Sequence, residues 1–121
     1  MSKMEGEANM RSGIYIVFFT GGSGSGSTVL AMDNGRIAGA DSAGAKVTGT
    51  YAEEAGQLKF SARYEFLQSS QLATSGAVVP PGFSFDINFE VPEATFLTAT
   101  VRINTPQGPA NAKFQYITEL P

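Results

Sequence analysis

Hydrophobic and polar residues alternate strictly in the segment FSFDINFEV, which spans residues 83–91. Because successive side chains of a β-strand point to opposite faces, this alternation predicts a strand with one apolar and one polar face. Residues 57–66 follow the same rule, with Leu58 and Phe60 on the apolar face and Lys59 on the polar face. Both segments are therefore predicted to border a hydrophobic core.

Further segments with a weaker two-residue alternation complete a predicted set of eight strands. They span residues 13–20, 27–33, 36–40, 46–52, 95–104 and 111–119. Turn-forming residues separate these segments, above all Asn34-Gly35, a strong short signal for a β-hairpin. Short strands at such regular spacing predict an all-β fold, either an antiparallel sandwich or a barrel. Residues 67–82 have no strong pattern and are expected to form a long connection, with room for one helical turn, at the rim or as a lid.

The segment IYIVFF, residues 14–19, departs from the alternation because both of its faces are apolar. The second apolar face needs cover from something other than water. Two covers are open at this point. One is a loop or the N-terminal segment of the same chain, and the other is a second copy of the protein in a homodimer through this strand.

The stretch GGSGSGS, residues 21–27, follows this first strand and resembles a phosphate-binding loop. Such a loop needs a lysine that reaches the phosphates and a helix that follows it. Ser27 stands where the lysine is needed, and the next residues have the pattern of a strand. The stretch is therefore interpreted as a flexible connection between the first two strands.

The composition narrows the chemistry that the chain can carry out. It has no histidine and no cysteine, which excludes a Ser-His-Asp triad, thiol catalysis, disulfides and the usual zinc sites. Asp33 and Asp41 flank the first hairpin, where we expect them to accept hydrogen bonds from backbone N–H groups rather than to bind a metal. We therefore expect no enzyme, no cofactor and no metal site.

The charge and hydrophobicity of the chain limit the partners and the location that we expect for the protein. The net charge is −3 and the sequence has no basic cluster, which argues against a nucleic-acid partner. No segment reaches the roughly 18 apolar residues of a membrane helix, and the N-terminal residues are too polar for a secretion signal. We expect no membrane partner and a cytoplasmic location.

An ordered set of short motifs resembles the GrlR-like family, small barrel proteins named after a negative regulator of type III secretion gene expression. The motifs are Gly13-x-Tyr15-x-Val17-x-Phe19, the hairpin DNGRIAGADS at 33–42, VTGTY at 47–51 and Arg63-Tyr64. The resemblance covers residues 13–66, about half of the chain. It implies an eight-stranded antiparallel, lipocalin-like barrel, often dimeric. For the namesake, it implies a regulator that binds a transcriptional activator rather than DNA.

The resemblance also identifies a candidate partner-binding turn. The positions that match an acidic turn of the namesake are Glu53 and Glu54, and a solvated hairpin tip is the alternative interpretation of this pair. The polar N-terminal residues predict a disordered lead-in over residues 1–11, and the length of the chain predicts a single domain, the β-barrel, over residues 12–121.

The interior of such a barrel offers a second candidate site. An eight-stranded barrel can be filled by its side chains or can hold one small ligand. The inward positions that would line such a ligand site are Phe60, Tyr64, Phe85, Phe89, Phe114 and Tyr116. Two functions follow: a non-enzymatic regulatory protein that acts through protein–protein contact, or alternatively a carrier or sensor of a small hydrophobic ligand inside the barrel.

Overall fold

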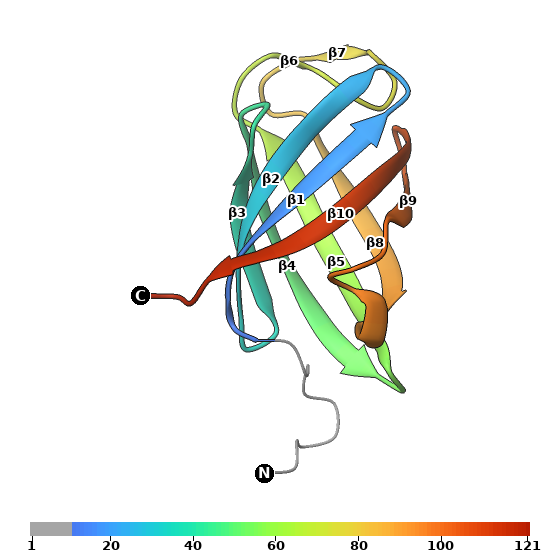
Figure 1. Cartoon of the computed structure of the whole chain (residues 1–121). Coiled ribbons are helices and arrows are strands. Elements are labelled where there is room, and N and C mark those ends of the chain that lie inside the picture. The colour runs from blue at the N-terminus through green and yellow to red at the C-terminus, as the bar shows by residue number, and fades with distance from the viewer. Residues whose placement is uncertain (1–10) are drawn as a thin grey trace.

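The structure is a computed structural model that describes residues 11–121 (Figure 1). Eight strands form one antiparallel sheet, and two very short strands form a separate hairpin. The strands of the large sheet are β1 (Gly13–Gly21), β2 (Gly24–Asp33), β3 (Arg36–Asp41), β4 (Ala45–Glu54), β5 (Gln57–Phe66), β8 (Ser84–Pro92), β9 (Val101–Thr105) and β10 (Gly108–Thr118). The remaining elements are β6 (Ser70–Gln71), β7 (Val78–Val79) and a 3-10 helix, η1 (Glu93–Thr95).

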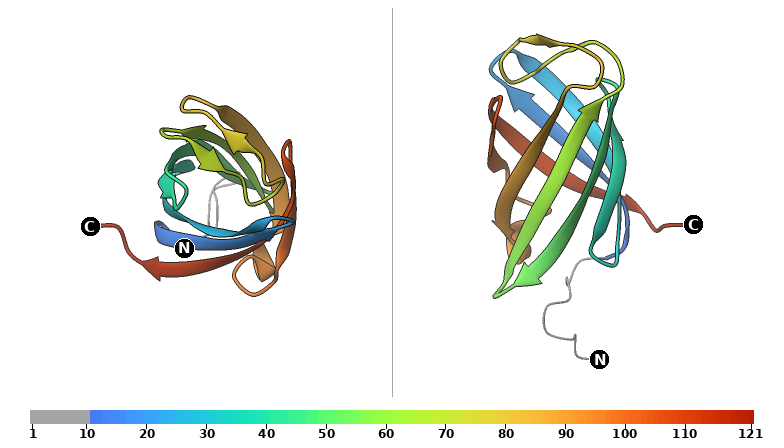
Figure 2. Two further views of the ribbon diagram at one scale, coloured as in Figure 1. Left: turned by 90° about the horizontal axis from the view of Figure 1, so that it is seen from above. Right: turned by 180° about the vertical axis from the view of Figure 1, so that it is seen from behind.

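The large sheet curls into a nearly closed barrel. Its strand order is β8-β5-β4-β3-β2-β1-β10-β9, so that β8 and β9 are the two edges. The views from the front and from above show these edges meeting on one side of the barrel (Figures 1 and 2). The predicted eight-stranded antiparallel barrel is confirmed. No helix within residues 11–121 is long and apolar enough to span a membrane.

Two inward-facing glycines allow the strands on one side of the barrel to bend and approach closely. A Cβ atom at Gly39 would lie 2.0 Å from the carbonyl oxygen of Val29 on β2. A Cβ atom at Gly49 would lie 2.1 Å from the carbonyl oxygen of Ser61 on β5. Neither approach is possible for a residue with a side chain, so these glycines are required by the curvature of β3 and β4.

The strand predicted over 95–104 is shorter than expected. The chain leaves β8 through η1, and β9 begins at Val101. Local hydrogen bonds hold the intervening turn, among them Ala99 N–H to the Thr95 carbonyl at 2.9 Å. The turn places Phe96 in the core, where it is almost fully buried. Burial of this aromatic ring overrides the weak strand pattern of the segment.

The interpretation of GGSGSGS as a flexible connection was wrong. Gly22 and Ser23 form a tight turn, and the rest of the stretch belongs to the paired strands β1 and β2. Gly26 lies opposite Phe19, whose ring covers it so closely that a Cβ atom there would be 2.7 Å from the ring. An aromatic side chain across the strand thus compensates for the missing side chain of the glycine.

The first strand has the two apolar faces that the sequence predicts. Tyr15 and Val17 are buried in the barrel, while Ile14, Ile16 and Phe18 face outward. Phe18 is 50% exposed. The N-terminal segment, one of the two candidate covers, lies in residues 1–10 and so outside the described residues, as does the predicted disordered lead-in except for Arg11. The choice between the two covers stays open.

Candidate functional site

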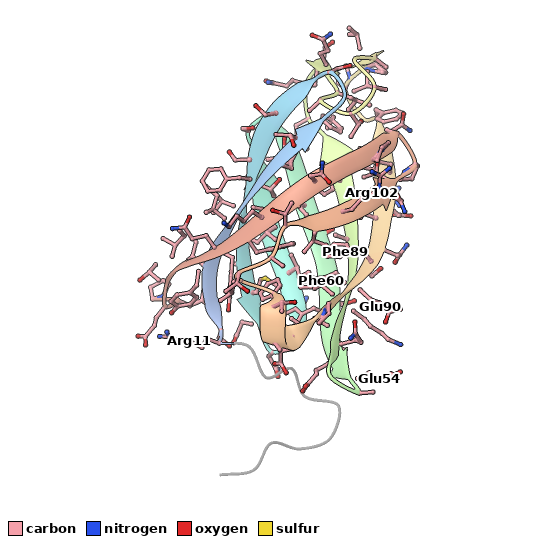
Figure 3. All side chains as sticks on the ribbon, turned by 45° about the vertical axis from the view of Figure 1, so that its right-hand side comes forward. Arg11, Glu54, Phe60, Phe89, Glu90 and Arg102 are labelled. Atoms are coloured by element: carbon pink, nitrogen blue, oxygen red, sulfur yellow. The ribbon has the colours of Figure 1, made fainter. Side chains whose placement is uncertain are left out.

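Stacked aromatic rings fill the half of the barrel that lies nearest η1. Phe60 is at the centre of this cluster, and its ring centroid lies 4.8 Å from that of Phe89, 5.6 Å from Phe96 and 5.8 Å from Phe114. Figure 3 shows Phe60 and Phe89 close together between the strands of this half. Rings at these separations form a dense core that leaves no room for a ligand.

A pair of tyrosines belongs to the same filled half. Tyr15 and Tyr116 pack edge to face with centroids 5.3 Å apart, and the Arg11 guanidinium lies 4.3 Å from the centroid of the Tyr116 ring. The Tyr15 hydroxyl donates a hydrogen bond to the Arg11 carbonyl (2.6 Å). Burial raises the pKa of Tyr15 to about 12. The Tyr116 hydroxyl is buried and has no hydrogen-bond partner among the described residues.

The opposite half of the barrel contains a cavity of about 120 Å³. Its walls combine rings, Phe19, Tyr64 and Phe85, with small residues such as Gly26 and Ala112. The small residues leave the void, because they occupy inward positions that large side chains take in the other half. For comparison, an apolar cavity of about 150 Å³ in another protein stays dry and binds benzene.

The connection 67–82 covers this cavity as a lid. It contains the β6–β7 hairpin, which lies across the barrel end in the view from above (Figure 2). Leu72 and Val79 of the lid are buried and pack with Phe66. The segment has one helical turn, closed by the Gly76 N–H that donates to the Leu72 carbonyl at 2.8 Å. Its expected position over the barrel end is also observed.

Hydrogen bonds attach the lid to the turns at the end of the barrel. Ser70 Oγ donates to the Ala43 carbonyl at 2.8 Å. The N–H of Ser23, in the β1–β2 turn, donates to the Ala73 carbonyl at 2.8 Å. Gly21 makes the second contact possible, because a Cβ atom at this position would lie 2.6 Å from the same carbonyl oxygen.

A polar cluster lies on the wall of the apolar cavity. Thr28 on β2 pairs across the sheet with Asp41 on β3, and Thr28 Oγ1 donates to Asp41 Oδ1 at 2.6 Å. Thr28 Oγ1 also lies 3.1 Å from the Tyr64 hydroxyl. Burial is the main cause that raises the pKa of Tyr64 to about 12.

Asp41 is a buried carboxylate with few partners. It is 8% exposed and lines the cavity. Its Oδ2 accepts a hydrogen bond from the Ala43 N–H at 2.9 Å, which confirms the expected capping of the backbone. Within residues 11–121 no lysine or arginine forms an ion pair with it. Asp41 therefore presents its carboxylate to a largely apolar space. The other lining residues with polar side chains are Ser25, Ser42, Tyr64, Gln71, Thr74 and Thr105.

The six aromatic residues proposed to line a ligand site divide between the two halves of the barrel. Tyr64 and Phe85 line the cavity, and their rings stack with centroids 5.4 Å apart. The other four, Phe60, Phe89, Phe114 and Tyr116, pack in the filled half. Thr28 and Asp41 were not predicted to belong to this site. The sequence feature that could have identified Thr28 is a polar residue at an inward position of an alternating strand, as in Thr28-x-Leu30-x-Met32.

Glu53 and Glu54 lie far from the cavity, at the hairpin between β4 and β5. This hairpin is tight, with Ala55 and Gly56 both at positive φ. Glu54 Oε1 accepts a hydrogen bond from Lys59 Nζ at 2.9 Å. Figure 3 shows Glu54 at the tip of the barrel opposite the lid. Glu54 is exposed and Glu53 is half-buried. Glu54 is available to a partner, but its ion pair with Lys59 also explains its presence at a solvated turn.

Comparisons of this chain with protein-family models, with curated proteins and with solved structures find no match. The resemblance to the GrlR-like family stays a prediction. Among residues 11–121, no three acidic side chains are grouped in a way that could hold a metal ion.

Proposed function

We propose that the protein is a non-enzymatic binding protein that holds one small, largely apolar molecule in the cavity beneath its lid. The observation that carries this proposal is the uneven filling of the barrel. One half is packed with stacked rings, while the other has a cavity of about 120 Å³ between Phe85, Ala112 and the lid residue Leu72. Burial of apolar ligand surface in such a space is favourable.

The proposal is tested with ethylbenzene, a small apolar molecule with a single ring. We expect it to shift the amide NMR signals of Leu72, Ala112 and Phe85 and to raise the melting temperature in proportion to its concentration. The variant Ala112→Leu fills the cavity from its wall and is expected to abolish both effects. The matched control Ala52→Leu makes the same change on the exposed face of β4 and should leave binding intact.

The proposal fails if ethylbenzene leaves the spectrum of the wild-type protein unchanged at millimolar concentration. Native mass spectrometry of the protein taken directly from cells is the complementary measurement. A small mass that is lost on denaturation identifies the bound molecule. The cytoplasmic location expected from the sequence is not tested by either measurement and stays a prediction.

A second function, self-association, is supported by the outer face of β1 and β2. Ile16 lies opposite Val29, and Phe18 is the next outward residue of β1. Phe18 and Val29 are 50% and 45% exposed, which is unusual for large apolar side chains on adjacent strands. The outward positions of β1 between Ile14 and Phe18 carry no charge, and the exposed Lys113 of β10 borders this face opposite Phe18. The apolar side chains of two copies can pack together about a two-fold axis.

This second proposal is tested by the molar mass in solution. Light scattering during size-exclusion chromatography should give the mass of a dimer for the wild-type protein and of a monomer for Phe18→Ser. A monomer in both cases contradicts it. The regulatory role that the family resemblance implies would instead require a protein partner, and replacement of Glu53 and Glu54 by alanine should then weaken its capture.

A further inference from the structure

Within residues 11–121, no cationic side chain forms an ion pair with the Asp41 carboxylate. Buried carboxylates are nearly always paired with a cation or surrounded by several donors. Asp41 has two donors, the Thr28 hydroxyl and the Ala43 N–H, one on each oxygen. An ionised carboxylate can accept about four hydrogen bonds, so acceptor capacity remains on both oxygens.

The hydrogen bonds around Thr28 leave the remaining acceptor positions of Asp41 free for a ligand. The Thr28 hydroxyl has one proton, and the short contact of 2.6 Å assigns it to Asp41 Oδ1. The proton in the 3.1 Å contact between Thr28 and Tyr64 therefore belongs to the Tyr64 hydroxyl. Tyr64 thus donates away from the cavity centre toward Thr28. The polar wall of the cavity then offers acceptors to a ligand and no strong donor from this cluster.

The rest of the cavity sets the shape of a suitable ligand. Val17, Phe85 and Ile87 provide apolar walls, and the volume of about 120 Å³ admits a single ring or a short branched chain. A ligand that matches both features has an apolar body and one head group that donates hydrogen bonds, preferably with a positive charge. A carboxylic acid is disfavoured, because its charge would repel Asp41.

We propose that the cavity selects small organic amines, with the ammonium group at Asp41 and the apolar body beneath the lid. This inference rests on the proposed function, because it requires that a small molecule occupies the cavity. It adds the chemical class of that molecule. The cluster of Thr28, Asp41 and Ala43 acts as the anchor, since the first and the last hold the carboxylate in a fixed orientation.

The test compares ligands of nearly equal shape on the full-length protein by amide NMR titration. Benzylamine, protonated at neutral pH, has the same heavy-atom skeleton as ethylbenzene, and benzoate carries the opposite charge. We expect benzylamine to bind at least about tenfold more tightly than ethylbenzene, the ratio expected for one charge-assisted hydrogen bond. Benzoate should bind more weakly than both.

The variant Asp41→Asn keeps the shape of the side chain and removes its charge. It should weaken benzylamine binding by about tenfold or more and leave ethylbenzene binding within about twofold of wild type. Asp86→Asn is the matched control, because it makes the same change on the exposed face of β8 and should preserve the preference for the amine. The comparison of the three ligands on the wild-type protein remains decisive if the Asp41 variant does not fold.

The outcomes separate this inference from the function on which it rests. If ethylbenzene binds and benzylamine binds no more tightly, the preference for amines is overturned while ligand binding in the cavity stands. If benzoate binds most tightly, the assignment of Asp41 as the anchor is overturned. If none of the three ligands binds at millimolar concentration, the proposed function itself is overturned, and the inference with it.

Discussion

At the scale of single residues, the hydroxyl of Thr28 joins Asp41 and Tyr64, two residues that line the cavity. We expect Thr28→Val to lower the free energy of unfolding by about 2–3 kcal/mol, because it leaves a buried carboxylate oxygen and a buried tyrosine hydroxyl without their partner. Urea unfolding followed by circular dichroism measures this loss. Thr48→Val is the matched control on the exposed face of β4 and should change stability by less than about 0.5 kcal/mol.

Loss of the hydroxyl group should change the free energy of unfolding differently at Tyr15 and Tyr116, which pack against each other. The Tyr15 hydroxyl donates to the Arg11 carbonyl, so Tyr15→Phe should cost about 1 kcal/mol of unfolding free energy. The Tyr116 hydroxyl is buried without a hydrogen-bond partner in the described part of the chain, so Tyr116→Phe should be neutral or stabilising. A larger loss for Tyr116→Phe than for Tyr15→Phe, measured by urea unfolding, would contradict this assignment.

At the scale of the elements, the alternation predicted every strand of the large sheet, and only the segment 95–104 was predicted too long. Residues 57–66 were predicted to form a strand and are β5 without change, because every second side chain of this segment faces the core. Only the second half of the segment 95–104 forms a strand, and the burial of Phe96 decides the structure of its first half instead. A local sequence pattern does not predict this burial, because the residues that pack against Phe96 belong to strands that are distant in the sequence.

The Gly-Ser segment illustrates a different reason for an incorrect prediction. Alternating glycine and serine have low intrinsic preference for a strand, so the composition indicated a flexible loop. In the barrel, β1 supplies both the hydrogen-bond partners and the Phe19 ring that covers Gly26. Tertiary pairing thus outweighs intrinsic preference here, and the inward-facing glycine leaves space that becomes part of the cavity.

The curvature of β4 gives a further test at the level of the element. Gly49→Ala places a methyl group against the backbone of β5 at Ser61, which cannot move aside as a flexible side chain could. We expect a loss of about 3 kcal/mol or more in the free energy of unfolding, the upper range for overpacking. Gly24→Ala adds the same methyl group where the nearest atom is 4.0 Å away and should be tolerated. Equal stability of the two variants would show that β4 relaxes without cost.

At the scale of the whole molecule, the sequence indicated which side chains face inward but not how they divide the interior. The division depends on Phe96, which enters from a turn after β8, and on the lid, which covers the opposite end. Neither segment has an alternating pattern that places it relative to the barrel. The sequence therefore left two alternatives open, a barrel filled by side chains and a barrel that holds a small ligand. The position of the cavity and the role of Asp41 became clear only from the three-dimensional structure.

The buried tyrosines make the stability of the whole barrel sensitive to alkaline pH. Burial raises the pKa of both Tyr15 and Tyr64 to about 12 in the folded protein, whereas an unfolded tyrosine loses its proton near pH 10. Between these values the unfolded state binds fewer protons, so the free energy of unfolding falls as the pH rises. The contribution is intact below pH 10 and decreases by at most about 1.4 kcal/mol per pH unit for each tyrosine.

Urea unfolding at a series of pH values from neutral to strongly alkaline measures this decline. Tyr64→Phe removes one of the two groups and should make the decline above pH 10 less steep, even if the variant is less stable at neutral pH. The change in slope distinguishes proton linkage from lost packing, because lost packing lowers stability equally at every pH. An unchanged slope would mean that the Tyr64 hydroxyl is exposed to water in solution, which would place water in the cavity and weaken the case for an apolar ligand.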